Sequence, residues 1–121
     1  MPRRSNLART GHKFGAVKTV ADGIVFPSKL EARRYLVLIE MEREGLIQGL
    51  KVSARSPSEK KDLTWRLEVN DQLIWKYVTD FTYYERGKFI VDDAKGKITP
   101  VYRAKAKMMK ALYGIVIRET R

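Results

Sequence analysis

Phe89-Ile90-Val91-Asp92-Asp93-Ala94-Lys95-Gly96 is the most informative stretch of this 121-residue chain. An apolar run typical of a β-strand ends in a carboxylate, one spacer residue and a lysine. Because side chains alternate between the two faces of a strand, Asp93 and Lys95 point the same way, about 7 Å apart along it. Asp92 then points to the opposite face, which indicates a structural or supporting role for its side chain.

Two more acids extend the pattern. Asp80 closes a second apolar run, residues 73–81, and Glu31 lies far upstream. Strand ends that carry acids beside a lysine can hold a divalent cation and a water, which is the equipment for cutting phosphodiester bonds. Ordinary alternatives exist for each residue. Glu31 would also serve as the capping-box partner of Ser28, Asp80 would simply end a strand, and residues 92–96 would form a charged turn.

The composition limits the chemistry. The chain has no cysteine and a single histidine, His12, which excludes disulfide scaffolds, thiolate zinc sites and histidine-rich metal sites. Any metal would be oxygen-ligated, which favours Mg²⁺ or Mn²⁺. No apolar stretch approaches the length of a membrane span, and the basic N-terminus has no following apolar region. We therefore expect a cytoplasmic protein, in a bacterium or a phage-infected host cell.

The charge is strongly positive and concentrated at both ends. The net charge is +11 and the isoelectric point is about 10.0. The pattern predicts a flexible basic arm over residues 1–20 and a nucleic acid as partner. The length allows a single domain, over residues 21–121. Candidate DNA contacts are the basic and polar residues of the arm and helices: Arg3, Arg4, Arg9, Lys13, Lys18, Ser28, Lys29, Arg33, Arg34, Lys97, Tyr102, Arg103, Lys105 and Lys107.

Periodicity and turn signals predict the order helix, three strands, helix, strand. A short strand, 24–26, precedes a helix that Ser28 caps and Gly45 ends, with an apolar stripe that includes Leu36, Val37 and Leu38. The expected elements after it are a buried flank at 46–50, a polar loop at 55–62, an antiparallel meander of strands 63–69, 73–81 and 88–95, a helix from Thr99 to Gly114, and a last strand at 115–117.

This layout resembles the PD-(D/E)xK nuclease superfamily, and more closely a family of phage-encoded, RecB-like nucleases. Four blocks of the chain carry the resemblance: residues 22–35 (DGIVFPSKLEARRY), 77–83 (YVTDFTY), 92–96 (DDAKG), and 102–105 with 113–119 (YRAK and YGIVIRE). The layout is also similar to small Holliday junction resolvases of archaeal type. Thr79 stands where the superfamily has a nominal proline, and Asp93 stands where many relatives have Glu.

The resemblance implies an α/β protein with a restriction-endonuclease-like core, in which helices flank a mixed central sheet. It further implies catalytic roles for Glu31, Asp80, Asp93 and Lys95. Asp80, Asp93 and the carbonyl of Ala94 would bind one Mg²⁺, and Glu31 would complete a second metal position or orient a water. Three surrounding carboxylates favour the charged form of Lys95, so charge stabilisation is expected of it over general-base catalysis.

The expected substrate is branched DNA, most of all a four-way junction cut by a symmetric homodimer with two opposed nicks. Trp75 and Tyr77 are candidate exposed residues for the dimer surface. The main alternative is a non-catalytic DNA-binding protein that keeps the nuclease fold. A basic RNA-binding or ribosome-associated protein is a third possibility, which the acid triad disfavours because acids without a metal repel phosphate.

Overall fold

The computed structural model describes residues 17–121, and it shows a mixed α/β fold with three helices. The strands are β1 (Thr19–Ala21), β2 (Ile24–Phe26), β3 (Gln48–Val52), β4 (Thr64–Val69), β5 (Gln72–Val78), β6 (Phe81–Glu85), β7 (Lys88–Ala94) and β8 (Arg118–Thr120). The helices are α1 (Lys29–Arg43), α2 (Pro57–Asp62) and α3 (Pro100–Tyr113).

The central sheet has four strands in the order β3-β6-β7-β8. β3 and β7 each pair antiparallel with β6, whereas β8 pairs parallel with β7 after the chain has crossed over through α3. The sheet is therefore mixed, because a parallel neighbour requires such a crossover. The β1–β2 and β4–β5 hairpins form two separate antiparallel pairs.

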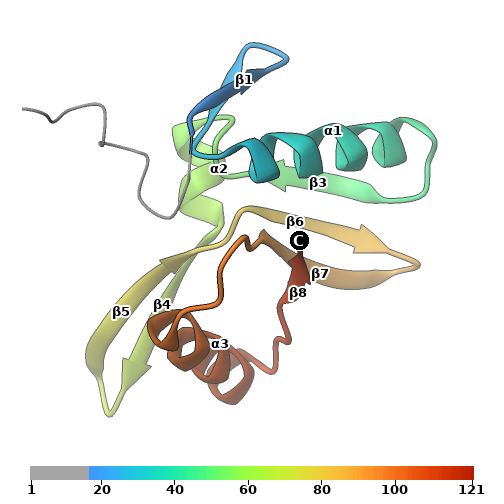
Figure 1. Cartoon of the computed structure of the whole chain (residues 1–121). Helices are drawn as coiled ribbons and strands as arrows, with labels where there is room; N and C mark the ends of the chain where they lie inside the picture. Colours follow the sequence, from blue (N-terminus) through green and yellow to red (C-terminus); the bar gives the residue numbers. More distant parts are fainter. Residues whose placement is uncertain (1–16) are drawn as a thin grey trace, which may run out of the picture.

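Helix α1 and helix α3 lie on opposite sides of the central sheet (Figure 1). Two apolar clusters hold these layers together. The first lies between α1 and one face of the sheet, and contains Phe26, Tyr35, Leu38, Phe81 and Tyr83 among others. The second joins the opposite face to α3 and the β4–β5 hairpin, and contains Leu67, Tyr77, Val91, Tyr102, Met109 and Ile117. The sheet thus separates two cores, and the carboxyl end of β7 lies between them.

Both long helices begin where the sequence predicts. The Ser28 hydroxyl accepts from the Glu31 backbone N–H at 3.1 Å, and Thr99 caps α3 in the same way, through Tyr102. Gly114 ends α3 with a positive φ of 69°, a conformation that suits a residue without a side chain. The Ile24–Phe26 strand is also confirmed as β2.

The apolar stripe predicted for α1 was partly wrong. Leu36 and Val37 are 46% and 49% exposed, while the buried face consists of Glu31, Ala32, Tyr35 and Leu38. A carboxylate therefore takes a place on the inward face that the hydrophobic pattern assigned to aliphatic residues. Leu46 is likewise exposed, whereas Ile47 is buried as expected.

The predicted three-strand meander was wrong. The run at 73–81 is two strands: β5 ends at Val78 and pairs only with β4, and β6 begins at Phe81 in the central sheet. Thr79 and Asp80 lie at the junction where the chain changes sheets. A continuous apolar run does not reveal such a change, because the side chains on both sides of the junction are largely apolar.

Three further boundaries differ from the prediction. Residues 57–62 form α2 rather than a loop, and Ser56 caps it by accepting from the Glu59 N–H. The final strand is Arg118–Thr120 instead of 115–117, and the segment around Leu50 is a strand, β3. Of the expected arm, residues 1–16 lie outside the described part, and residues 19–20 belong to β1.

Candidate functional site

Three chain segments bring Glu31, Asp80, Asp93 and Lys95 together. Glu31 lies in the first turn of α1, Asp80 at the β5–β6 junction, and Asp93 and Lys95 at and just beyond the end of β7. Glu31 and Asp93 are 5% and 1% exposed. The sequence predicted this set, and the tertiary structure places its members within electrostatic reach of one another.

A reciprocal pair of hydrogen bonds joins Asp80 to β7. The backbone N–H of Asp80 donates to Asp93 Oδ1 at 2.7 Å, and the backbone N–H of Ala94 donates to Asp80 Oδ2 at 2.9 Å. A backbone N–H of the β5–β6 junction therefore fixes the Asp93 carboxylate, and a backbone N–H of β7 fixes the Asp80 carboxylate. This geometry requires β5 to end before Asp80, since the residue must turn its amide away from the β4–β5 ladder.

Thr79 holds that junction in place. It is fully buried, its N–H donates to the carbonyl of Leu63 at 3.0 Å, and its hydroxyl accepts from the Trp65 indole N–H at 3.2 Å. Proline, the nominal residue here in the resembled superfamily, has no N–H to donate. The departure from that pattern thus has a structural reason in this chain: threonine anchors Asp80 to the end of α2.

Two tyrosines lie close to Lys95: Tyr77, a candidate for the dimer surface in the sequence analysis, and Tyr102, a candidate DNA contact. Lys95 Nζ lies 3.4 Å from Asp93 Oδ2, 4.4 Å from the ring centroid of Tyr102 and 5.7 Å from that of Tyr77. The Tyr77 hydroxyl donates to the same Asp93 oxygen. Ring faces attract an ammonium ion, so the two rings and the carboxylate together hold it at one position.

The crowded acids shift each other's ionisation. Burial first, and then the charge of Asp93, raise the pKa of Glu31 to about 7, against lowering by a hydrogen bond with Asp80 and by Lys95. Burial also raises the pKa of Asp80 well above its usual range, with Asp93 and Glu31 adding to the effect. At neutral pH the site therefore retains protons that exposed carboxylates would have lost.

A cavity of about 360 Å³ opens beside the acids. Glu31 and Asp80 form part of its lining, together with Lys60 of α2 and the small or apolar residues Val25, Pro27, Ser53, Ala54 and Val78. Lys60 had been placed in a loop by the sequence pattern and was not among the candidate residues. The acids are thus reached from the side of α2 and the β1–β2 hairpin.

The donor set suits a hard cation, although it is not arranged as a complete metal cage. Over residues 17–121, no group of three or more His, Asp or Glu side chains is positioned to hold a metal ion. Mg²⁺, however, is commonly held by one or two carboxylates and keeps several waters. Asp80 and Asp93, already linked by backbone hydrogen bonds, match that smaller requirement, since each carboxylate oxygen has more than one lone pair.

Asp92 has the supporting position that strand alternation predicts. It is fully buried on the α1 side, where it accepts from Arg34 Nη2 at 2.7 Å, from the Tyr83 hydroxyl at 2.5 Å and from the Thr120 hydroxyl at 3.1 Å. The residue next to Asp93 thus ties β7 to α1, β6 and β8.

The candidate DNA contacts fall into three groups. Arg3, Arg4, Arg9 and Lys13 lie outside the described residues. Several have intramolecular partners: Ser28 caps α1, Arg34 pairs with Asp92, the Tyr102 hydroxyl donates to Glu119, and Lys105 Nζ lies 5.6 Å from the Trp75 ring. The exposed members are Lys18, Lys29, Arg33, Lys97, Arg103 and Lys107.

The prediction that Tyr77 is an exposed residue of a dimer surface was wrong. Tyr77 is only 6% exposed, with its ring in the second core and its hydroxyl on Asp93. Trp75 is half-buried against the same core. Exposed apolar side chains of the hairpin are instead Val69, Leu73 and Ile74.

None of the helices in the described part is long and apolar enough to cross a membrane. Comparison with curated proteins and with solved structures gives no significant match. A family profile does match, and it covers residues 11–119, which include every residue of the acid and lysine cluster. The chain therefore belongs to the family described as "Protein of unknown function (DUF1064)".

Proposed function

We propose that this protein is a metal-dependent DNA endonuclease of the PD-(D/E)xK type, with a restriction-endonuclease-like core. The observation that carries the proposal is the convergence of Glu31, Asp80, Asp93 and Lys95 from segments up to 64 residues apart in the chain. Three mutually repelling carboxylates beside one lysine reduce the stability of the fold. Clusters with such a cost are typical of sites that carry out chemistry.

In this proposal Asp80, Asp93 and the Ala94 carbonyl hold Mg²⁺, for which Mn²⁺ is a substitute. The ion, when bound, lowers the pKa of a coordinated water and neutralises charge on the scissile phosphate. The protein's own part is positioning. Asp93, Tyr77 and Tyr102 hold the ammonium of Lys95 where negative charge develops, and Glu31 orients the water.

Branched DNA, and a four-way junction in particular, is the substrate we propose, with two copies of the chain acting as a symmetric dimer. A domain of this size holds one such cluster, and resolving a junction needs two cuts on strands of like polarity, which a two-fold axis supplies. The net charge of +11 suits a partner with several converging duplex arms.

The test is a matched cleavage and binding assay on a four-way junction, a flap and a plain duplex, with Mg²⁺ or with EDTA. Asp93→Asn and Lys95→Ala should abolish cleavage and leave binding within about threefold, because affinity comes from phosphate contacts elsewhere. Asp71→Asn, in an exposed turn, and Lys61→Ala, on exposed α2, are controls with the same charge changes.

The outcomes separate the candidate functions. Full activity in either site variant would end the catalytic assignment. Binding without cleavage in both Mg²⁺ and Mn²⁺ would favour the non-catalytic DNA-binding protein. Cleavage that prefers plain duplex, or a monomer by sedimentation under assay conditions, would remove the resolvase assignment and leave a structure-insensitive nuclease.

A further inference from the structure

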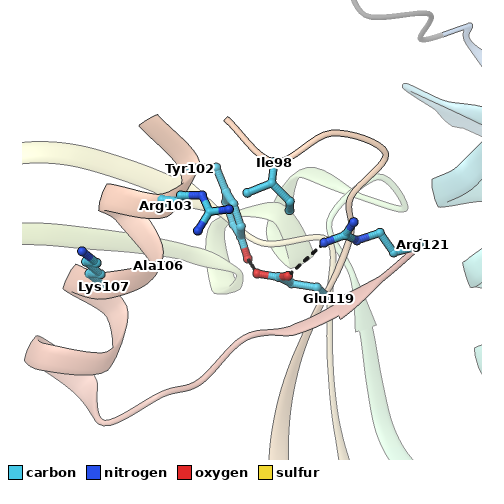
Figure 2. A pocket seen from close by; sticks show the side chains of 7 residues that line it. All are labelled: Ile98, Tyr102, Arg103, Ala106, Lys107, Glu119 and Arg121. Atoms are coloured by element: carbon cyan, nitrogen blue, oxygen red, sulfur yellow. Dashed lines mark hydrogen bonds and ion pairs between the residues drawn. The ribbon is translucent and has the colours of Figure 1, made fainter. Parts of the chain in front are cut away.

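A second cavity, of about 300 Å³, lies between α3 and β8. Its lining consists of Ile98, Tyr102, Arg103, Ala106, Lys107, Glu119 and Arg121. Figure 2 shows Arg103 and Arg121 on opposite sides of the Tyr102–Glu119 pair, with Lys107 one turn further along α3. Three cations therefore surround a cavity that has one acid.

The acid is already engaged. Glu119 Oε2 accepts from the Tyr102 hydroxyl at 2.8 Å, and Glu119 Oε1 lies 3.7 Å from Arg121 Nη2. Arg103 and Lys107 are exposed and form no ion pair with any of residues 17–121. The cavity thus keeps uncompensated positive charge, and a planar guanidinium is well suited to two hydrogen bonds with one phosphate.

Tyr102 separates this cavity from the acid cluster, which consists of Glu31, Asp80 and Asp93. Its hydroxyl end lies in the cavity with Glu119, while Lys95 Nζ lies 4.4 Å from its ring centroid. A group bound in the cavity is therefore separated from the Lys95 ammonium by the Tyr102 ring. A smaller cavity of about 180 Å³, which shares Lys107 and adds Lys110, continues the basic surface along α3.

We propose that the α3–β8 cavity binds a backbone phosphate of the same nucleic-acid strand that reaches the acid cluster, held by Arg103, Lys107 and Arg121. The inference rests on the proposed function, which supplies the nucleic-acid strand. The group that the cavity binds is a phosphodiester of that strand. Lys95 and the cavity then contact neighbouring parts of one strand, and α3 fixes the direction in which that strand leaves the site.

Binding in EDTA tests the cavity without any need for cleavage. Anisotropy of a fluorescein-labelled single strand and of a labelled four-way junction is measured over a salt series for Arg103→Ala, Lys107→Ala and Arg121→Ala. Each variant should weaken binding about fivefold and reduce the log–log salt slope by about 0.7 to 0.9, the value for one lost phosphate contact. Lys61→Ala, which removes one exposed charge from α2, should stay within twofold.

Glu119→Gln gives a change of the opposite sign. The amide oxygen still accepts from Tyr102, but the negative charge is removed, so binding should tighten about threefold. Thermal melting of each variant excludes loss of fold as the cause. If the three cation variants bind like Lys61→Ala, or Glu119→Gln weakens binding, the phosphate assignment is wrong.

Two further experiments are needed. One distinguishes a nucleic-acid strand from free phosphate as the ligand, and the other distinguishes the cavity proposal from the nuclease proposal. Calorimetry with inorganic phosphate should show binding far weaker than that of the oligonucleotides. If the cation variants lose binding of inorganic phosphate but keep binding of the oligonucleotides, the assignment to a nucleic-acid strand is wrong. If no DNA is cut in Mg²⁺ or Mn²⁺ while the EDTA results hold, the nuclease proposal fails and the cavity remains a nucleic-acid site.

Discussion

At the scale of single residues, the position of Lys95 depends on neighbours that carry no charge of their own. Tyr102 and Tyr77 are both 6% exposed, and their ring centroids are 6.3 Å apart. Lys95 lies close to both rings and 3.4 Å from Asp93. A lysine on a long flexible side chain would otherwise sample many rotamers, so the rings restrict where its ammonium group stands.

Tyr102→Leu should lower kcat for cleavage about fivefold with little change in KM. The ring contact with the ammonium is worth about 1 kcal/mol, which corresponds to about a fivefold change in rate. Tyr102→Phe keeps the ring and loses only the hydroxyl bond to Glu119, so its kcat should stay within twofold. Equal loss in the two variants would contradict the positioning role, and melting curves control for lost packing.

Glu31 makes the stability of the metal-free protein depend on pH. Its pKa is raised to about 7 in the folded state by burial and by Asp93, so between its unfolded pKa and 7 the folded state binds more protons. The free energy of unfolding should therefore fall as pH rises from about 5 to 8, by on the order of 2 kcal/mol. Asp80 acts in the same direction.

Urea denaturation in EDTA at several pH values measures this fall. Glu31→Gln should make the fall clearly smaller and leave the part that is due to Asp80, whereas Glu44→Gln, on an exposed part of the same segment, should keep the parent's slope. An unchanged slope in Glu31→Gln would show that another group is responsible.

At the scale of elements, the acid cluster depends on how strand ends are tied. Asp92 links β7 to α1 through Arg34, to β6 through Tyr83 and to β8 through Thr120. The Thr79 N–H donates to the carbonyl of Leu63, which ends α2, and the Ser53 N–H donates to the Asp80 carbonyl at 3.0 Å. Elements that contain no candidate catalytic residue, such as α2, β6 and β8, thus help to fix the positions of Asp80 and Asp93.

Asp92→Ala should reduce the free energy of unfolding by about 3 kcal/mol or more. It leaves Arg34, whose side chain is only 16% exposed, without its partner, and losing one member of a buried pair costs far more than the pair contributes. Asp62→Ala removes an acid from the exposed Lys51–Asp62 pair and should cost less than about 1 kcal/mol. Chemical denaturation of both variants compares them, and equal losses would contradict the account.

At the scale of the whole molecule, charge is distributed unevenly along the chain. Residues 1–16 contribute four of the cations, Arg3, Arg4, Arg9 and Lys13, and no acid. Exposed lysines and arginines of α1 and α3 contribute others. A polyanionic partner, as proposed, would meet positive charge from segments that are separate in sequence.

Removing residues 1–16 should weaken binding to every DNA and flatten its salt dependence. Each lost phosphate contact reduces the log–log slope by about 0.9 on duplex, so the four cations set an upper limit of roughly 3.6. The cut leaves the strand that begins at Thr19 complete. A salt titration decides the matter: an unchanged slope would show that the remaining chain makes all the phosphate contacts.

The sequence by itself determined the local features of this protein. The caps at Ser28, Thr99 and Gly114, the strand before Asp93 and the opposite faces of Asp92 and Asp93 all follow from short-range rules. The same S-x-x-E signature that marked Ser28 also marks α2 at Ser56, so that helix was available to sequence reasoning and was missed.

Only the tertiary structure decided which segments meet. Sequence periodicity does not show that the chain changes sheets at Thr79 and Asp80, because both flanking strands are apolar. Nor does it show that Glu31 is buried on a helix face, or that Tyr77 and Tyr102 surround Lys95. These contacts join residues far apart in sequence, and their energies come from packing and burial, which no local pattern encodes.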